Sequence, residues 1–581
     1  MVTTMSIRNQ TRPSAEQSSN VERRFNPTIE RILSHRGYSS DQIKNLLSSN
    51  LNELPDLLAM HGMSKASERI IKAFESNEGI GIYGDYDVDG TTSCALFYHF
   101  FQMLGVEVKL YQPSRFVEGY GVHPSAIDEA LKNDVKVLIT VDCGITNSEA
   151  CDYALTKGVD LIITDHHKDA LEQMPSAYEI VNPNRRDEDE ESELKFLAGV
   201  GVAFALCLQI KKDLHKKGMD MGSIYPLLPF VAIGTICDLA RLTPMNLKLT
   251  RHGLSYIKKG TYPGLNAFIS CAERAYPIIP SEKISFNVGP MINSKGRLDH
   301  PEKALKLLIS DNGEECSLLY NQLEICNRER KFIQADVYKE AKEQVLAELK
   351  DDAPVFNVVY APHWHEGVIG IVASKLVETF KVPSIVFSDS AEKGIIKGSA
   401  RTAGQVSIFD LLQENKDLFI KFGGHKAAAG LSMKQENLPL LKKALNEELS
   451  QTPEILRVVQ DTYDIQIGPE EINANLLKEL EQLEPFGMGN KKPIFRMQNI
   501  TIDSYQLMKD IHVRWSIKSK SMPSKTFRGI SFNYIGKFNT PSPEELFSRQ
   551  EHEELEVQFT LGINRFNGRE YIQLMVEKFI F

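Results

Sequence analysis

Residues Gly79–Gly90, GIGIYGDYDVDG, join a short apolar run to three aspartates and a glycine. An apolar run of this length, bounded by glycine and aspartate, is typical of a strand that is buried on both faces. The residues that follow, TTSCALFYHFFQML, have the length and apolar content of a buried helix. Asp85, Asp87 and Asp89 would therefore stand where a strand ends and a helix begins.

Two further runs repeat this pattern. VKVLITVDCG runs into Asp142, and VDLIITDHH runs into Asp165. Strands rich in Val, Ile and Leu that alternate with helices indicate a parallel sheet covered on both faces. In such sheets the carboxyl ends of the strands meet at one edge, where the functional site lies. The sequence therefore predicts an α/β fold with acidic residues gathered at that edge.

The rest of the chain divides by its patterns. A polar stretch with few helix breakers, NQLEICNRERKFIQADVYKEAKEQVLAELK, predicts a long helix, and VFNVVYA and PSIVFS predict strands of a second α/β unit. This unit has glycine-rich segments at Lys397–Arg401 and Gly423–Gly430, which we interpret as turns. Short alternating runs near the C-terminus indicate a small β-barrel or sandwich. The expected parts are a helical extension (1–78), an α/β domain with a helical part (79–310), a connecting long helix (311–352), a second α/β domain (353–452) and the barrel (453–581).

The net charge of −10 bears on which classes of binding partner are expected, and above all on nucleic acids. An acidic chain is a poor general binder of phosphates, but a whole-chain sum hides basic patches, and a metal site built of carboxylates lowers it. The eight cysteines form no CxxC pair, which argues against a structural zinc site and a disulfide framework. Because no apolar run approaches the roughly 20 residues of a spanning helix and no signal-peptide pattern is present, we expect a cytoplasmic protein with no membrane partner.

The DxDxDG run that starts at Asp85 also opens the calcium loop of an EF-hand. That loop needs a glutamate at its twelfth position, which here is Leu96, and a helix where this chain has a predicted strand. The calcium interpretation therefore fails. Carboxylates packed at one sheet edge repel one another, and oxygen ligands suit Mg²⁺ and Mn²⁺, with an imidazole favouring Mn²⁺ slightly. Besides the three aspartates, the side chains expected at this edge are Asp142, Asp165, His166 and Asp238.

Four motifs, in order, resemble the DHH phosphoesterase superfamily. They are DYDVDG at 85–90, VDCG at 141–144, DHH at 165–167 and CD at 237–238. GSAR at 398–401 and GGHKAAAG at 423–430 resemble the DHH-associated domain. NSKGR at 293–297 and EPFGMGNKKPIF at 484–495 resemble the RecJ family of exonucleases in particular. The resemblance runs from about Gly79 to the C-terminus, and GNKKP has lysines where that family often has proline.

The resemblance implies two metal ions, Mn²⁺ or Mg²⁺. Asp87, Asp142 and Asp238 would bind one ion, and Asp89, Asp142 and His166 would bind the other, so that Asp142 bridges them. Two such ions, about 3.5–4 Å apart, can activate a bridging water and clamp the attacking and leaving oxygens of a phosphodiester.

Three further residues of the motifs would act beside the ions. By the same resemblance, Asp85 would serve catalysis from behind the ligands or through a water, and Asp165 would support the ligands from behind. His167 would contact the scissile phosphate or assist protonation. No side-chain nucleophile is required.

The resemblance also implies that the chain binds a DNA backbone. Arg115, Arg297, Ser399, Arg401 and His425 would hold the 5′-phosphate and the scissile region, and the glycines around the last three would let main-chain N–H groups approach phosphates. The C-terminal domain resembles an OB-fold, which binds single strands by aromatic stacking and a basic groove. Its aromatic residues are either core or stacking platforms, and the sequence does not choose among Trp515, Phe527, Tyr534 and Phe566.

The function implied is a single-stranded-DNA-specific exonuclease that works from 5′ to 3′ and releases 5′-mononucleotides in recombination and repair. A helicase and a single-strand-binding protein are plausible partners, and the family suggests a monomer. One alternative is a DHH oligonucleotidase or nucleotide phosphatase for short substrates, although such relatives usually lack a β-barrel domain. A second alternative is a non-enzymatic scaffold, which the filled ligand positions disfavour.

Overall fold

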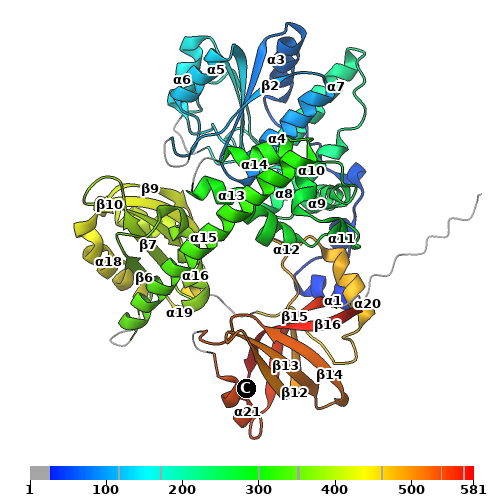
Figure 1. Cartoon of the computed structure of the whole chain (residues 1–581), viewed down its shortest axis with the longest axis vertical. Coiled ribbons are helices and arrows are strands. Elements are labelled where there is room, and N and C mark those ends of the chain that lie inside the picture. The colour runs from blue at the N-terminus through cyan, green and yellow to red at the C-terminus, as the bar shows by residue number, and fades with distance from the viewer. Residues whose placement is uncertain are drawn as a thin grey trace, which may run out of the picture.

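Three sheets follow one another along the chain in this computed structural model (Figure 1). The structure describes residues 27–114, 118–169, 173–298, 301–349, 354–458, 462–537, 540–566 and 569–581. Among these residues, no helix combines the length and the apolar character that crossing a membrane requires.

The first sheet is fully parallel, with the strand order β2-β1-β3-β4-β5. Three of its strands lie where the apolar runs predicted them. The bounds are β1 (Gly79–Gly84), β2 (Val108–Tyr111), β3 (Val135–Val141), β4 (Asp160–Thr164) and β5 (Glu179–Val181).

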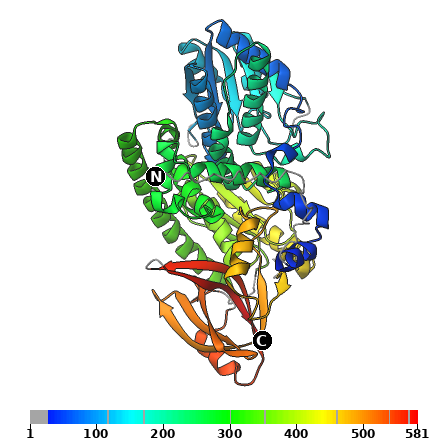
Figure 2. The same ribbon diagram turned by 90° about the vertical axis from the view of Figure 1, so that its right-hand side faces the viewer.

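Helices cover both faces of this sheet, as predicted for buried parallel strands (Figures 1 and 2). Ile82 and Ile139 face one hydrophobic core, while Tyr83 and Leu138 face the other, because successive side chains of a strand alternate. On the first face lie α3 (Met63–Glu75), α4 (Val88–Met103) and α7 (Gly199–Lys216), and on the second lie α5 (Pro124–Lys132) and α6 (Ser148–Lys157).

A helical part completes the first α/β unit. The helices of this part run from Leu228 to Ile309. They are α8 (Leu228–Cys237), α9 (Pro244–Ile257), α10 (Pro263–Phe268), α11 (Cys271–Arg274), α12 (Ser281–Lys283), the π-helical turn η4 (Ile284–Val288), α13 (Gly289–Leu298) and α14 (Glu302–Ile309).

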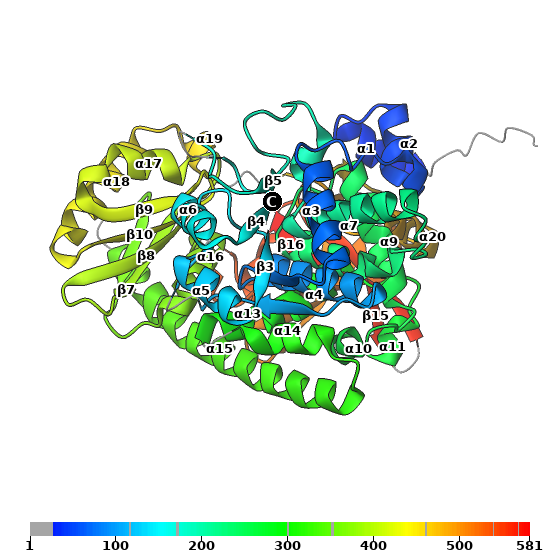
Figure 3. The same ribbon diagram turned by 90° about the horizontal axis from the view of Figure 1, so that it is seen from above.

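The predicted long helix is α15 (Gly313–Glu348), with 36 residues. The Asn312 side chain caps its start by accepting from the N–H groups of Glu314 and Glu315. Its buried residues recur at helical spacing along one face, including Leu323, Val337 and Val345. The helix packs first on α13 and α14 and then on α16 and β6, so it joins the two α/β units along one edge of the molecule (Figure 3).

The second sheet is mixed, with the strand order β6-β7-β8-β10-β9. The glycine-rich segments that we interpreted as turns are mostly strand: Lys397–Arg401 lies inside β8, and Gly423–Gly430 spans the end of β9 and the start of β10. Glycine is tolerated there because neighbouring strands fix the backbone. The elements are β6 (Asn357–Tyr360), α16 (Glu366–Phe380), β7 (Ser384–Asp389), β8 (Ile395–Arg401), α17 (Ile408–Glu414), β9 (Phe419–His425), β10 (Ala428–Lys434), α18 (Leu438–Ser450) and α19 (Glu454–Arg457).

The C-terminal strands form the predicted barrel, which closes because β12 pairs with both β13 and β15. Its strands are longer than the sequence suggested. Trp515, Phe527 and Tyr534 are buried in its interior, so they are core residues; the side chain of Phe566 lies outside the described residues. The elements are β11 (Ile465–Gln466), α20 (Ala474–Leu480), β12 (Phe495–Met508), β13 (His512–Ser519), β14 (Met522–Ser531), α21 (Pro543–Arg549), β15 (Leu555–Phe566) and β16 (Arg569–Ile580).

The N-terminal helices α1 (Pro27–His35) and α2 (Ser40–Leu47) lie against this barrel and not only against the first domain (Figures 1 and 2). Ile32 and Leu46 belong to the same hydrophobic core as barrel residues such as Phe495, and Leu247 of α9 joins it. Arg36 pairs through two nitrogens with Asp464, at 2.6 and 3.1 Å. The helices α1 and α2 and the C-terminal barrel domain are therefore bound together.

Candidate metal centre

Three aspartates stand side by side at the carboxyl edge of the first sheet. Each extends its strand by one backbone hydrogen bond: Asp85 N–H donates to Val141, Asp142 N–H to Thr164, and Asp165 N–H to Val181, at 3.0–3.3 Å. The predicted convergence of these residues is confirmed. It follows from the parallel strand order, because equivalent ends of β1, β3 and β4 meet at one level.

The first turn of α4 adds Asp87 and Asp89. The Oδ1 atom of Asp87 caps the helix by accepting from the N–H groups of Asp89 and Gly90, at 2.9 and 3.1 Å. Asp89 is fully buried, and its carboxylate accepts from the N–H groups of Gly199 and Val200, at 2.6 and 2.9 Å. These donors open α7, and the positive end of the helix dipole stabilises a negative charge there.

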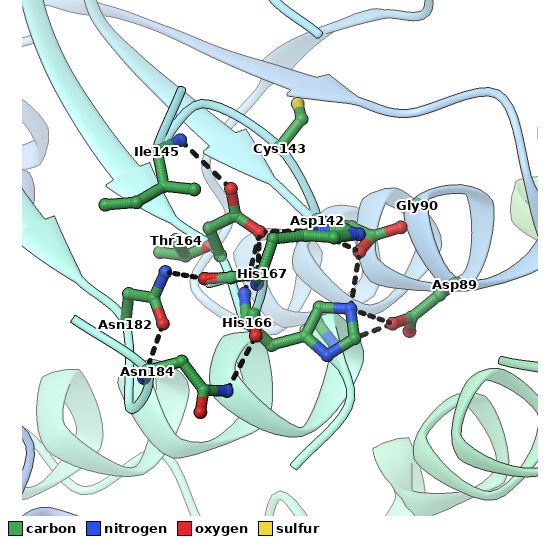
Figure 4. A network of polar contacts seen from close by, with 12 residues as sticks. Asp89, Gly90, Asp142, Cys143, Ile145, Thr164, His166, His167, Asn182 and Asn184 are labelled. Carbon is green, nitrogen blue, oxygen red and sulfur yellow. Dashed lines mark hydrogen bonds and ion pairs between the residues drawn. The ribbon is translucent and has the colours of Figure 1, made fainter. Parts of the chain in front are cut away.

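The imidazole of His166 lies next to Asp142 and Asp89 (Figure 4). Its Nε2 atom is 3.1 Å from Asp142 Oδ1, 3.8 Å from Asp89 Oδ2 and 3.9 Å from Asp238 Oδ2. A further group whose ligand atoms lie within 4.8 Å of one another contains Asp85, Asp87 and Asp142. The five residues expected to bind metal are thus brought together, although β1, α4, β3, β4 and α8 are spread over about 150 residues of sequence.

The donor set fits a divalent cation. Asp142 Oδ1 and His166 Nε2 are both buried, and neither makes a hydrogen bond within the described residues. Burial and the positive charge of His167 lower the pKa of His166 to about 4, so its imidazole is neutral and its lone pair is available. Burial, followed by the charges of Asp89 and Asp87, raises the pKa of Asp142 well above its ordinary value. A bound cation would offset the repulsion between the carboxylates that contributes to the raised pKa of Asp142.

Asp165 is placed differently from the ligands. Its carboxylate accepts from the N–H groups of Ile145, His166 and His167, and from Nδ1 of His167 at 2.8 Å. This set of donors keeps the carboxylate ionised, and its pKa is lowered even though burial opposes this. These hydrogen bonds hold the two histidines in place, and Asp165 belongs to none of the groups of candidate ligands found among the described residues.

His167 is the cationic member of the site. Burial favours its neutral form, but the hydrogen bond to Asp165 and the charges of Asp165, Asp238 and Asp87 raise its pKa to about 9. The Tyr120 hydroxyl lies 3.0 Å from its Nδ1 and donates to the Asp142 carbonyl at 3.3 Å. A proton donor therefore stands beside the carboxylates at neutral pH.

Two asparagines that sequence reasoning missed support the histidines from below (Figure 4). The side-chain amide of Asn182 donates to the His167 carbonyl at 2.9 Å, and that of Asn184 donates to the His166 carbonyl at 2.7 Å. They follow β5 in the sequence VNPN. Their position after another strand of the same sheet was the available signal.

The second α/β unit faces this centre. The Nη1 atom of Arg297, at the end of α13, donates to the Gly367 carbonyl of α16 at 3.2 Å. Burial and the positive charges of His167 and Lys168 lower the pKa of His425, which places this β9 residue near the first domain. Ser399 and Arg401 bond to each other on β8, next to α16. Arg115 lies outside the described residues.

A cavity of about 670 Å³, the inner cavity, opens beside the metal centre. Cys237 and Leu239, the neighbours of Asp238, line it together with Arg297. Leu239, Phe286 and Met488 expose 64%, 71% and 59% of their surface, which makes one wall unusually apolar for a solvent-facing site. The inner cavity thus offers apolar surface and cations next to the carboxylates.

Comparisons with known proteins fit this arrangement. Residues 79–235 match the N-terminal domain of the DHH family, residues 354–451 the DHHA1 domain and residues 463–578 the RecJ OB domain. The chain is 33% identical over 556 residues to the single-stranded-DNA-specific exonuclease RecJ of Bacillus subtilis, covering 95% of this chain and 67% of that one. It is 30% identical over 584 residues to the protein of that name from Escherichia coli, covering 97% and 98%. The chain belongs to the RecJ family.

The RecJ likeness extends to the fold. The structure of Thermus thermophilus RecJ in complex with Mn²⁺ has a TM-score of 0.76 and 26% identity, covering 96% of this chain and 76% of that one. The same protein in complex with Mg²⁺ has a TM-score of 0.72, with 25% identity and coverage of 96% and 74%. The expected cofactors, Mn²⁺ or Mg²⁺, thus agree with both the carboxylate cluster and the RecJ relatives.

The pKa values of the carboxylates predict how pH affects the stability of the metal-free protein. Burial, followed by the negative charge of Asp87, raises the pKa of Asp89 to about 7. Burial, followed by the negative charges of Asp89 and Asp87, raises the pKa of Asp238 to about 9. Because both values are raised on folding, the stability that they contribute is complete below about pH 4. It is lost as pH rises through 7 to 9. We therefore expect metal-free protein to melt several degrees lower at pH 9 than at pH 6.

The matching measurement is thermal unfolding at both pH values, with EDTA and with Mg²⁺. Metal binding displaces protons from these carboxylates, so the stabilisation by Mg²⁺ should grow with pH. Asp238→Asn should flatten the metal-free pH dependence. Equal melting temperatures at pH 6 and 9 in the wild-type metal-free protein would contradict this account.

Proposed function

We propose that this protein is a metal-dependent exonuclease that degrades single-stranded DNA from its 5′ end to 5′-mononucleotides, in recombination and repair. The observation that carries the proposal is the convergence of Asp87, Asp89, Asp142, His166 and Asp238 beside a cavity with a cationic and apolar lining, in a chain of the RecJ family. The curated relatives named above are single-stranded-DNA-specific exonucleases.

The side chains would divide the work as follows. Asp87, Asp142 and Asp238 would hold one ion, and Asp89, Asp142 and His166 the second. When bound, the ions would supply a water of lowered pKa and neutralise charge on the phosphate. Asp165 holds His167 in orientation through the 2.8 Å bond to its Nδ1.

His167 would carry out the acid and base chemistry, and Asp85 would support it. The imidazolium form of His167, which is one-third exposed, would bind the scissile phosphate or donate a proton to the leaving oxygen. Asp85 is buried next to Asp87 and Asp142 and would assist them.

The second α/β unit would set the direction of digestion, from the 5′ end. Ser399, Arg401 and His425, with Arg297 and Arg115, would bind the 5′-phosphate and the scissile region. Arg401 carries a planar guanidinium that suits bidentate phosphate recognition. Its Nη1 bonds to Ser399 Oγ at 2.9 Å and to the Ala400 carbonyl at 2.7 Å, so it is preoriented on β8.

A nuclease assay tests the proposal directly. The substrates are a single-stranded DNA labelled at either end, its duplex and matching RNA, each with Mn²⁺, with Asp165→Ala as the inactive control. We expect release of mononucleotide from the 5′ label, with the duplex spared. Cleavage confined to dinucleotides or nucleotide phosphates would favour the short-substrate alternative.

Arg401→Ala should raise KM for 5′-phosphorylated strands about tenfold or more, because a charge-assisted hydrogen bond is worth roughly 1.5–3 kcal/mol. For strands with a 5′-hydroxyl the effect should be small. Steady-state kinetics on the two substrates measures the difference. Lys434→Ala, a cation at the opposite end of the neighbouring strand β10, is the matched control. An unchanged KM ratio would remove Arg401 from the 5′-phosphate site.

The proposal has further parts. We also propose the division of the chain at 78, 310, 352 and 452; the three separate sheets support it beyond residue 78, whereas α3, which precedes that boundary, packs on the first sheet. A cytoplasmic location, a monomeric state, and a helicase and a single-strand-binding protein as partners are in keeping with a DNA-processing enzyme.

A further inference from the structure

A second cavity lies across a short loop from the inner cavity. This junction cavity, of about 370 Å³, is formed where the N-terminal helices meet the barrel domain. Its lining includes His35, Tyr38, Tyr463, Lys491 and Lys492. The two lysines also line the inner cavity, so the loop that carries them is a wall common to both.

The loop Gly487–Lys492 is fixed to the first domain close to the metal centre. The Leu242 N–H, four residues after Asp238, donates to the Met488 carbonyl at 2.7 Å. The buried Asn490 side chain donates to the carbonyls of Leu483 and Pro485, at 2.7 and 2.9 Å. Gly489 has a φ of 81° and leaves no room for a side chain, since a Cβ would lie 2.7 Å from Arg241 Cγ. The wall is therefore rigid and begins near the reacting centre.

The two lysines of the wall differ in their partners. Lys492 pairs with Glu282 at 2.7 Å on the side of the inner cavity. Lys491 is exposed, and among the residues that the structure describes it makes no ion pair. An unpaired cation is held between the two cavities.

The charge of the junction cavity is positive despite the acidic chain. Its carboxylate, Asp464, is neutralised by the bidentate contact with Arg36 and also accepts from the Ile494 N–H at 2.8 Å. Lys491 is left without a compensating acid in the lining. Tyr38 and Tyr463 add two aromatic rings, and the Arg496 guanidinium lies 5.1 Å from the centre of the Tyr463 ring.

We propose that the junction cavity binds nucleotides of the substrate strand that lie on the 3′ side of the inner cavity, with Lys491 on a phosphate and the tyrosines against a base. The proposal rests on the proposed function. The inner cavity is lined by Cys237 and Leu239, the neighbours of Asp238, and by residues of this loop, so a single strand held at its 5′ end by the second α/β unit would have a route from the metal centre towards the loop. Cations interleaved with aromatic rings are the chemistry that binds single strands without sequence preference.

The inference gives the N-terminal helices a role in substrate binding. His35 and Tyr38 come from the end of α1 and the turn after it, and the Arg36–Asp464 pair fixes that turn to the barrel domain. Long strands would reach this cavity, whereas short ones would end before it.

Binding measured against strand length tests the proposal. The full-length protein, without divalent metal, is titrated with 5′-phosphorylated oligonucleotides of about 4 and about 20 nucleotides, lengths that bracket a typical single-strand site. Lys491→Glu and Tyr463→Ala should each weaken binding of the long strand about tenfold, the scale of one stacked base or one reversed phosphate contact. Binding of the short strand should not change.

Controls separate this effect from misfolding and from general charge. Lys132→Glu, at an exposed lysine in the last turn of α5 of the first domain, makes the same charge change outside both cavities and should behave like the wild type. Lys491→Arg should restore long-strand binding. Equal weakening at both lengths, or none at either, would overturn the junction site.

Photocrosslinking gives an independent readout. Iododeoxyuridine placed at successive positions should crosslink to Tyr38 or Tyr463 only from positions far from the 5′ end. Crosslinks from the first nucleotides, or from no position, contradict the proposal. If the wild type degrades single strands but the variants bind strands of every length as the wild type does, only the junction site is refuted. If the wild type degrades no single strand, the proposed function is refuted.

Discussion

Asp142→Asn should lower the rate of DNA hydrolysis by at least about a thousandfold. Asp142 lies at the centre of the cluster, with Oδ1 3.1 Å from His166 Nε2, and it would bridge the two ions. Losing one charged ligand from both ions removes several kcal/mol of transition-state stabilisation, and each 1.36 kcal/mol is a factor of about ten. Single-turnover kinetics with saturating Mn²⁺ measures the loss.

Asparagine is the better test here than alanine. Asp142 has a φ of 60°, a left-handed conformation that asparagine and aspartate adopt more readily than other residues with a side chain. The amide therefore keeps the backbone while removing the charge. Because repulsion in the cluster falls, metal-free Asp142→Asn should melt at or above the wild-type temperature, and Mn²⁺ should stabilise it less. Near-normal turnover would refute the bridging role.

Gly199→Ala should reduce turnover about a hundredfold, the scale of a misplacement of about 1 Å at a reacting centre. A Cβ at Gly199 would lie 2.8 Å from Asp142 Cβ and 3.0 Å from its Oδ1, so the first turn of α7 must move. That turn supplies the two N–H groups that hold Asp89. Both a bridging ligand and its neighbour would shift, and metal affinity should fall with turnover.

A matched control lies two residues further along the same helix. A Cβ at Gly201 would meet the tip of the Leu197 side chain at 2.9 Å, and a flexible side chain can move aside. Gly201→Ala should therefore keep most of the activity. Kinetics and Mn²⁺ titration of both variants make the comparison. Wild-type behaviour of Gly199→Ala would show that close contact between α7 and Asp142 is dispensable.

The sequence predicted the strand ends of the site well because parallel strands impose the convergence. Asp85, Asp142 and Asp165 needed only three apolar runs to be placed at one edge. It could not predict that Gly199 and Val200 hold Asp89, because those contacts join residues 110 and 111 positions apart and depend on how α7 packs. Asn182 and Asn184 were missed for a different reason, because a polar residue in a loop has many ordinary uses.

The phosphate-binding segments show a different limit. Glycine in GSAR and GGHKAAAG favoured turns by local propensity, yet pairing with neighbouring strands overrides that propensity in β8, β9 and β10. The aromatic residues of the barrel were ambiguous because alternation alone does not say which face is inside. The N-terminal helices carried no recognisable motif, and only the fold shows which surface they cover.

The packing of α1 and α2 into the barrel core has a consequence for biosynthesis. These helices leave the ribosome before the barrel strands that bury Ile32 and Leu46, because they precede those strands in the chain. Contacts so distant in sequence form slowly, because a long loop must close before they can stabilise anything. The nascent chain therefore exposes this apolar helical surface until the barrel strands are made, and loss of those strands would uncover the faces of α1 and α2 that pack against the barrel.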